Sequence, residues 1–105
     1  MLGELEQVVL LAVLRVGEEA YGVPVHREIA RQTGRDLALA TVHKTLSRLE
    51  DKGLVRSRTG EPTPTRGGRR RRYYAVTAEG ERALRQALGA LRRLAHGLPI
   101  GFDVP

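Results

Sequence analysis

The feature that most constrains the fold of this 105-residue chain is a change in the spacing of its apolar residues. Up to Lys52 these residues recur three and four positions apart, which places them on one face of a helix. Leu54 to Thr59 alternates charged or polar residues with small apolar ones, and Arg72 to Thr77 ends in Tyr-Tyr-Ala-Val-Thr, so both segments are predicted to be short strands. The helical spacing then returns. The pattern predicts a mainly α fold in which three helices are followed by a small β-hairpin and a last helix.

Glycines mark the ends of the first two predicted helices. The first runs from Glu4 to Val16 and is apolar on most of its circumference, so we expect it at the centre of the domain. The second ends before Gly34. On this helix we expect Val25, Ile29 and Ala30 to face the core. The side chains expected to face solvent are Arg27, Glu28, Arg31 and Gln32. Because aromatic residues make up only 4% of the chain, the core must consist of Leu, Val and Ala.

The third predicted helix, from Leu39 to Lys52, has two contrasting faces. Its apolar face consists of Leu39, Val42, Leu46 and Leu49. At 100° per residue, the other side carries a stripe of Thr41, Lys44, Thr45, Arg48 and Lys52. These side chains can donate hydrogen bonds to phosphates or base edges, so the stripe predicts a contact with DNA. The alternative is a solvated helix face.

The loop of the hairpin is the most biased segment of the chain. It is rich in Pro and Gly and ends in arginines, namely Arg66, Arg69, Arg70, Arg71 and Arg72. The whole chain carries 18 Lys and Arg against 12 Asp and Glu, a formal net charge of +6, which indicates a polyanionic partner. A phosphate backbone would relieve the repulsion among these arginines, whereas the alternative is a solubilising charged loop. A basic third helix followed by a basic hairpin tip is the arrangement of a winged helix-turn-helix.

Several short motifs, in order, also resemble one family, the PadR-like transcriptional regulators. The resemblance spans roughly residues 2–95. The motifs are Leu2-Gly-Glu-Leu-Glu, Glu19-Ala-Tyr-Gly-Val, Arg27-Glu-Ile, Thr33-Gly-Arg-Asp-Leu, Thr41-Val-His-Lys-Thr-Leu-Ser-Arg-Leu-Glu-Asp-Lys-Gly-Leu-Val, Gly60-Glu-Pro-Thr-Pro, Gly67-Gly-Arg-Arg-Arg-Arg-Tyr-Tyr-Ala-Val-Thr and Gly80.

The resemblance implies a bacterial repressor that binds a pseudo-palindromic operator as a homodimer and, as often in this family, is released by a small-molecule inducer. Two positions depart from the family pattern, since Ala38 and His43 stand where Ser and Tyr are common. Ala38 removes a helix N-cap, and His43 replaces a phenol that could bond a phosphate. The DNA affinity and base preference of the family are therefore not carried over to these two positions.

Double-stranded DNA is therefore the expected partner, and two sets of residues are expected to contact it. The recognition-helix set is Thr41, His43, Lys44, Thr45 and Arg48, and the wing set is Arg66, Arg69, Arg70 and Arg71, with Tyr21 on its flank. Lys44 and Arg48 are the strongest candidates for base contacts. Tyr21 is expected either to bond a phosphate or to pack against its neighbours, and one of Tyr73 and Tyr74 is expected to fill the core.

The last helix carries an apolar seam with alternating spacings of four and three. We expect a homodimer interface formed by Leu5, Val9, Leu84, Leu88, Leu91, Ala95 and Leu98, the alternative being packing within one chain. The predicted organisation is a winged-helix DNA-binding domain at 1–77, a C-terminal dimerisation helix at 78–97 and a flexible tail at 98–105.

Other chemistry has little support in the sequence. Cysteine is absent, the three histidines have no metal-ligand spacing, and no catalytic motif is present, so neither an enzyme nor a metal or other cofactor is predicted. The most apolar run, Val8–Leu14, is too short to span a membrane, and a cytoplasmic, nucleoid-associated protein is expected. The alternatives to a regulator are a non-specific basic RNA- or DNA-binding protein and a winged-helix protein-interaction module.

Overall fold

The order of elements is the one that the apolar spacing predicts. The computed structural model describes residues 2–62 and 70–100. Its elements are α1 (Glu4–Val16), a short 3-10 turn η1 (Gly17–Glu19), α2 (Gly22–Thr33), α3 (Leu39–Asp51), β1 (Val55–Pro62), β2 (Arg70–Val76) and α4 (Ala78–Ala95). Arg66 and Arg69, and the tail from residue 101 on, lie outside the described residues.

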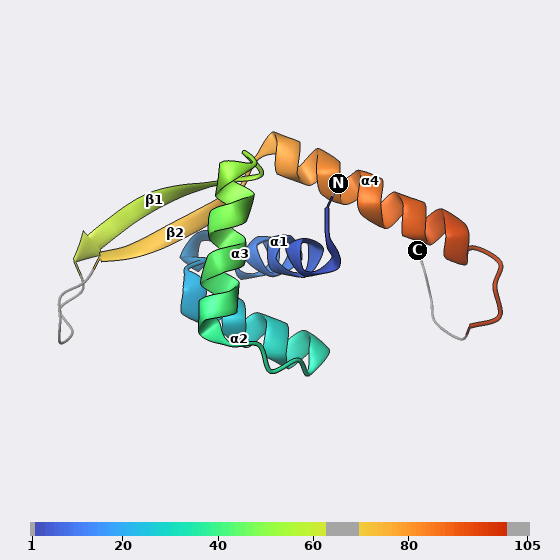
Figure 1. Ribbon diagram of the computed structural model, residues 1–105, viewed down its shortest axis with the longest axis horizontal. Helices are drawn as coiled ribbons and strands as arrows, with labels where there is room; N and C mark the ends of the chain where they lie inside the picture. The colour runs from blue at the N-terminus through green and yellow to red at the C-terminus, as the bar shows by residue number, and fades with distance from the viewer. Residues whose placement is uncertain (1, 63–69, 101–105) are drawn as a thin grey trace.

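The helix α1 lies at the centre of the domain, in contact with α2, α3, β2 and α4 (Figure 1). The largest fully buried side chains come from the first three helices: Val9, Leu10, Val25, Val42, Leu46 and Leu49. Full burial of such a side chain contributes about 1.5–3 kcal/mol to folding, so this aliphatic cluster holds the three helices together. The predicted central position of the first helix is confirmed.

The turn between α2 and α3 is held from two sides. Gly34 ends α2 with a φ of +72°, which a residue with a side chain rarely adopts. The ring of His26 hydrogen-bonds the carbonyl oxygen of Leu37 at 2.6 Å, and the guanidinium of Arg35 contacts both carboxylate oxygens of Glu4 at 2.8 and 2.9 Å. These contacts fix the direction in which the chain starts α3.

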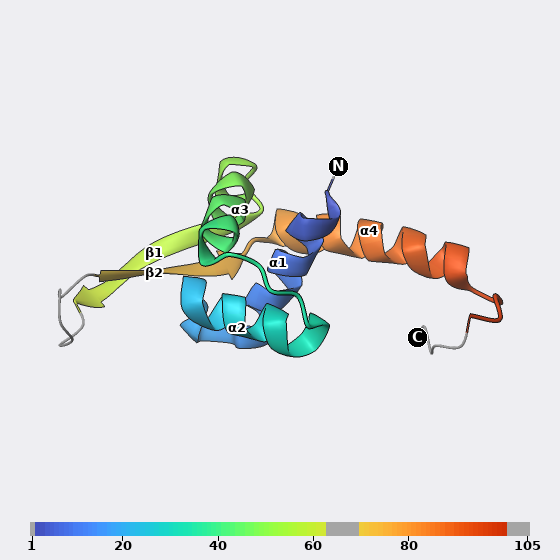
Figure 2. The same ribbon diagram turned by 60° about the horizontal axis from the view of Figure 1, so that its bottom comes forward.

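The hairpin is a two-stranded antiparallel ribbon that projects beside α3 (Figure 2). Its strands are longer than predicted: β1 continues through Gly60 to Pro62, with an irregular register between Thr59 and Pro62. A proline is tolerated here because each strand has one unpaired edge. Tyr74 is buried in the core and its backbone N–H donates to the carbonyl of Ala20 at 2.8 Å, which confirms that one tyrosine of the pair fills the core.

Among the residues that the structure describes, helix α4 is anchored to the rest of the domain near its start. The Thr77 hydroxyl accepts a hydrogen bond from Gly80 N–H at 3.1 Å and donates to the carbonyl of Gly53 at 2.8 Å. Leu84 is buried against the domain, whereas the second half of α4 extends away from it, opposite to the hairpin (Figure 1). Five large apolar side chains on this part and just beyond it are exposed: Leu88, Leu91, Leu94, Leu98 and Ile100.

Two orientations predicted from the helical spacing are wrong. Glu28 faces inward with 9% of its surface exposed, because Arg31 and Gln32 donate to its carboxylate at 2.6 and 2.9 Å. Leu39 is 38% exposed, since it is the first residue of α3 and lies at the margin of the core.

Within the described residues, no helix is both long enough and apolar enough to cross a bilayer.

Two residues of the predicted dimer interface are also placed differently. Val9 is fully buried and Leu84 is 3% exposed, so both belong to the core of their own chain and cannot meet a partner. The helices α1 and α4 pack against each other within one chain, and this packing uses the apolar positions nearest the start of α4. Leu5 is half-buried.

Candidate nucleic-acid interface

The exposed face of α3 presents two cations one helical turn apart. Lys44 and Arg48 are both exposed, and among residues 2–62 and 70–100 no carboxylate lies within ion-pair distance of either. Both side chains are long enough to reach base edges in a major groove. Thr41 is half-buried in the first turn of the helix, where free backbone N–H groups favour a phosphate.

The assignment of Thr45 to the DNA-contacting stripe is wrong. Its side chain is 3% exposed, and its hydroxyl donates to the carbonyl of Thr41 at 2.8 Å. Thr45 lies about 40° from Leu49 around the helix, at the edge of the apolar face, which a short side chain can join once its hydroxyl is bonded to the backbone.

Lys52, the last member of the stripe, is already paired. Its ammonium group lies 2.7 Å from a carboxylate oxygen of Glu6 on α1. The other oxygen of Glu6 accepts the Gly3 N–H at 2.9 Å. Burial alone would raise the pKa of Glu6, but the hydrogen bonds from Lys52 and Gly3 outweigh it, so the pKa is below its usual value. Glu6 therefore remains ionised near neutral pH.

His43 lies against the start of α2. A methyl group added to Gly22 would overlap the imidazole ring and come within 2.7 Å of its Nε2, so the absence of a side chain at position 22 makes room for the ring. His43 is exposed on its other side. The first turns of α2 and α3 therefore meet at one point on the surface, and the α3 N-terminus has no side-chain cap because Ala38 stands there.

A stack of two tyrosines and two arginines joins the hairpin to α2. The rings of Tyr21 and Tyr73 meet edge to face at 5.6 Å between centroids. The guanidinium of Arg71 lies 4.4 Å from the Tyr21 ring, and that of Arg58 lies 4.5 Å from the Tyr73 ring. A guanidinium that stacks on a ring keeps its in-plane N–H donors free, so the stack holds two guanidinium groups that can donate to phosphates on the outer face of the hairpin.

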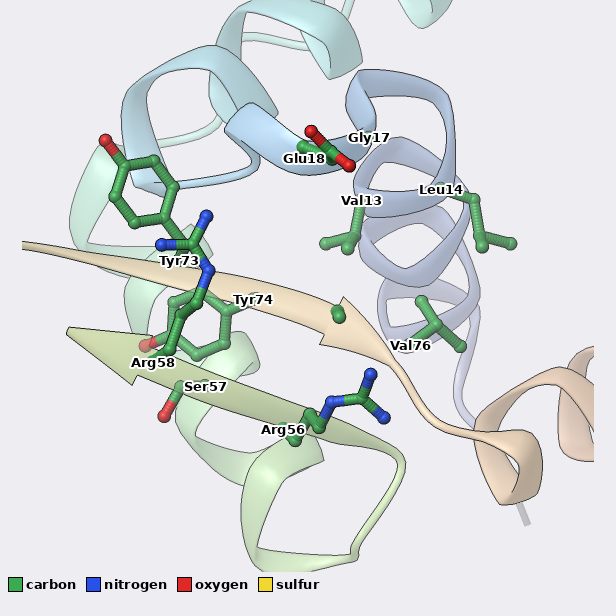
Figure 3. Close-up of a pocket in the computed structure, with 11 residues that line it drawn as sticks. Val13, Leu14, Gly17, Glu18, Arg56, Ser57, Arg58, Tyr73, Tyr74 and Val76 are labelled. Atoms are coloured by element: carbon green, nitrogen blue, oxygen red, sulfur yellow. The ribbon is translucent and has the colours of Figure 1, made fainter. Parts of the chain in front are cut away.

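The stack fills the outer face of the hairpin, next to an open groove of about 550 Å³ between that face and the end of α1. Figure 3 shows Arg56, Arg58 and Tyr73 on this side. Arg56 and Arg58 were not among the predicted contacts. Their alternation with Val55 and Ser57 in β1 was the available signal, because it places both arginines on the face opposite the core.

The predicted wing arginines have different environments where the structure describes them. Arg70 is exposed, and Arg71 is half-buried in the stack. Arg72 points to the other face, 3.8 Å from Glu50 of α3, which also accepts the Ser57 hydroxyl at 2.5 Å. The root of the wing is therefore tied to the C-terminal end of α3.

A basic α3, exposed on one side, together with a two-stranded basic wing on the same domain defines the winged helix-turn-helix class of DNA-binding proteins. The sequence profile of the family described as "Transcriptional regulator PadR-like family" matches residues 10–86. The chain belongs to this family, whose members are transcriptional regulators and not enzymes.

Solved structures agree with this assignment. A transcriptional regulator from Clostridium thermocellum is 25% identical, with 86% of this chain and 84% of that chain covered and a TM-score of 0.71. A PadR family transcriptional regulator from Eggerthella lenta is 30% identical, with 90% and 81% covered and a TM-score of 0.67. A PadR family regulator from Clostridium difficile, 24% identical over 86% and 93% of the chains with a TM-score of 0.62, shares the fold. Among curated proteins, none matches the sequence.

Proposed function

We propose that this protein is a homodimeric, cytoplasmic repressor that binds a pseudo-palindromic operator and thereby blocks transcription. The observation that carries the proposal is the pair of exposed cations, Lys44 and Arg48, one turn apart on the outward face of α3. In a winged helix-turn-helix this helix enters the major groove, where an arginine or lysine can bond the O6 and N7 of guanine.

The remaining polar groups act as anchors to phosphate. At the start of α3, Thr41 and His43 are proposed to contact phosphates. Arg70 and Arg71 of the wing, and Tyr21 beside it, are proposed to do the same. Arg66 and Arg69 of the wing tip are assigned to the same role from the sequence alone. Contacts of this kind position the protein but carry little sequence information, whereas the two α3 cations provide it.

Dimerisation rests on the apolar side chains that α4 leaves exposed. Leu94 is 76% exposed, and Leu91 and Leu98 are 57% and 56% exposed, which is unusual for three leucines along one helix end. A second copy is the proposed partner, through the helix at 78–97, with Leu88, Ala95 and Leu5 completing the seam. Twofold symmetry then relates two α3 helices on one face of the DNA, about 34–36 Å apart if the half-sites are one helical turn apart.

An inducer, in this proposal, acts on the geometry of the dimer. A small molecule changes operator occupancy only if it binds one spacing of the two α3 helices more tightly than the other. The ratio of its affinities for the two dimer geometries determines how far the equilibrium between the operator-binding and the non-binding dimer moves.

The test compares two arginine variants on two duplexes. Fluorescence anisotropy would measure the binding of wild type, Arg48→Ala and Arg85→Ala to an operator selected from genomic fragments and to a shuffled duplex. Arg85 is an exposed α4 arginine, so its loss removes the same charge far from α3. We expect wild type to prefer the operator by about 10³-fold or more. Arg48→Ala should lose about 1–3 kcal/mol on the operator and much less on the shuffled duplex.

Three results would contradict the proposal. Equal affinity of wild type for all duplexes would indicate a general nucleic-acid binder. An equal loss on both duplexes would remove Arg48 from the base contacts. Sedimentation that gives a monomer at micromolar concentration, unaffected by Leu94→Glu, would exclude the α4 seam and favour a protein-interaction module.

A further inference from the structure

The ion pair between Glu6 and Lys52 joins α1 to the C-terminal end of α3. The Glu6 side chain is only 7% exposed, whereas that of Lys52 is 42% exposed. A carboxylate with so little contact with water is costly to leave without a cation, so the structure strongly favours the paired state. The ammonium of Lys52 is consequently confined to one position.

Lys52 would otherwise be a phosphate ligand. It lies on the same side of α3 as Thr41 and Arg48, about 40° from Arg48 around the helix at 100° per residue. A mobile lysine on a DNA-facing stripe binds any sequence, because its contact is to the phosphate backbone. By pairing with Lys52, Glu6 limits the available cations of α3 to those in its first three turns.

The same pair restrains the orientation of α3. The C-terminal end of the helix is tied to α1 through Glu6, and the turn that leads into the helix is tied to the same α1 turn through Glu4 and Arg35. Base contacts depend on the register of the helix in the groove, whereas contacts to random phosphates tolerate a tilt.

We propose that Glu6 is a specificity-determining residue of the DNA-binding surface: it holds Lys52 away from phosphate and fixes the end of α3 against α1. The proposal rests on the proposed function, because it needs α3 to read the operator. Glu6 acts through Lys52 and α3 and does not itself contact DNA.

The test is Glu6→Gln, which preserves the size of the side chain and its hydrogen bond with Gly3. In about 0.1 M salt, we expect the affinity for a random duplex to rise about three- to tenfold, and the salt slope to steepen by about 0.9, because one more phosphate is neutralised. Affinity for the operator should rise less or fall, because α3 loses part of its restraint. The ratio of the two affinities should therefore fall at least about threefold.

Two further variants separate the causes. Glu81→Gln removes one negative charge from an exposed position on α4 and should change both affinities less than about twofold. Glu6→Gln/Lys52→Gln has no lysine to release, so its affinity for random duplex and its salt slope should return to wild-type values. A gain that persists in this double variant would overturn the assignment to Lys52.

The remaining outcomes are equally decisive. If Glu6→Gln raised the affinity equally for operator and random duplex, the change would reflect only the electrostatic effect of the lost charge. If it left both affinities and both salt slopes unchanged but lowered the melting temperature, the role of Glu6 would be purely structural. Either result overturns the proposal. If wild type itself fails to prefer any operator, the proposed function fails with it, whereas a wild-type preference that Glu6→Gln leaves intact refutes this inference alone.

Discussion

Two glycines within the one helix α4 should respond in opposite ways to substitution by alanine. At Gly80 an added methyl group would overlap the carbonyl oxygen of Leu54, and it would lie 2.8 Å from a methyl of Val76 and 3.1 Å from the Leu54 carbonyl carbon. At Gly89 the nearest neighbour would be the end of the Arg93 side chain at 3.4 Å. The first site is closed by backbone, which cannot rotate away, and the second is open.

The expected magnitude follows from three contributions. Forced close contact in a packed region costs about 1–3 kcal/mol. Shifting α4 to relieve it disturbs the Thr77 cap, whose loss costs about 1 kcal/mol. Alanine gains about 1 kcal/mol over glycine in a helix interior. Gly80→Ala should therefore lower the free energy of unfolding by about 2 kcal/mol, whereas Gly89→Ala should raise it by about 1 kcal/mol.

The assay is urea unfolding followed by circular dichroism, at one fixed protein concentration because dimerisation affects apparent stability. For a domain of this size, a loss of about 2 kcal/mol corresponds to a fall in Tm of roughly 10 °C. Equal stabilities of Gly80→Ala and Gly89→Ala would refute the close approach of α4 to Leu54. A destabilised Gly89→Ala would refute the claim that the middle of α4 is unpacked in the single chain.

Three further predictions concern the core, the carboxylates and the stack. Leu46→Ala should cost about 2–5 kcal/mol in urea unfolding, because the side chain is fully buried; a smaller loss would mean that the core collapses around the gap. Hydrogen bonds from Gln32 and Arg31 lower the pKa of Glu28 in the folded protein. The ionised carboxylate therefore stabilises the fold above the pKa that Glu28 has in the unfolded chain, and this contribution is lost as the pH falls through the folded-state pKa. In Glu28→Gln the free energy of unfolding should depend less steeply on pH on the acid side. Tyr21→Ala should lower stability by about 2 kcal/mol, since it removes an edge-to-face pair and a cation–π contact, whereas Tyr21→Phe should not; weaker DNA binding by Tyr21→Phe would indicate a phosphate bond from the hydroxyl.

The fold could be predicted from the sequence because its signals are local and agree with one another. The three- and four-residue spacing of Val42, Leu46 and Leu49 gave the buried face of α3 correctly. Gly34 ends α2 with a left-handed backbone, and Thr77 caps α4. Strand ends were less accurate, since pairing across the ribbon carries β1 through Gly60 and Pro62, two residues that in isolation favour a loop.

The candidate site was predicted less completely, because its connections are long-range. The helical wheel placed Lys52 and Arg48 in one stripe. The partner of Lys52, however, is Glu6, which lies 46 positions earlier in the sequence and comes close to it only when the chain is folded. The helical spacing assigned Glu28 and Thr45 to outward positions, yet bonds to neighbouring groups make their burial possible. Arg58 went unnoticed because its partner, Tyr73, lies on the other strand.

The position of α1 links the two parts of the proposed mechanism. One end of this 13-residue helix is bonded through Glu4 to the turn that leads into α3 and through Glu6 to the C-terminal end of α3, and the helix also packs against α4, the proposed dimerisation helix. A helix of this length is a rigid rod of about 20 Å, so a displacement imposed by α4 is transmitted rather than absorbed. A change in the dimer would therefore move α3 as a body and alter the spacing of the two recognition helices. Weakening the Glu6 link should reduce that transmission, so a dimer-seam variant such as Leu94→Glu should affect operator affinity less in a Glu6→Gln background than in wild type, a coupling that a double-mutant cycle measures directly.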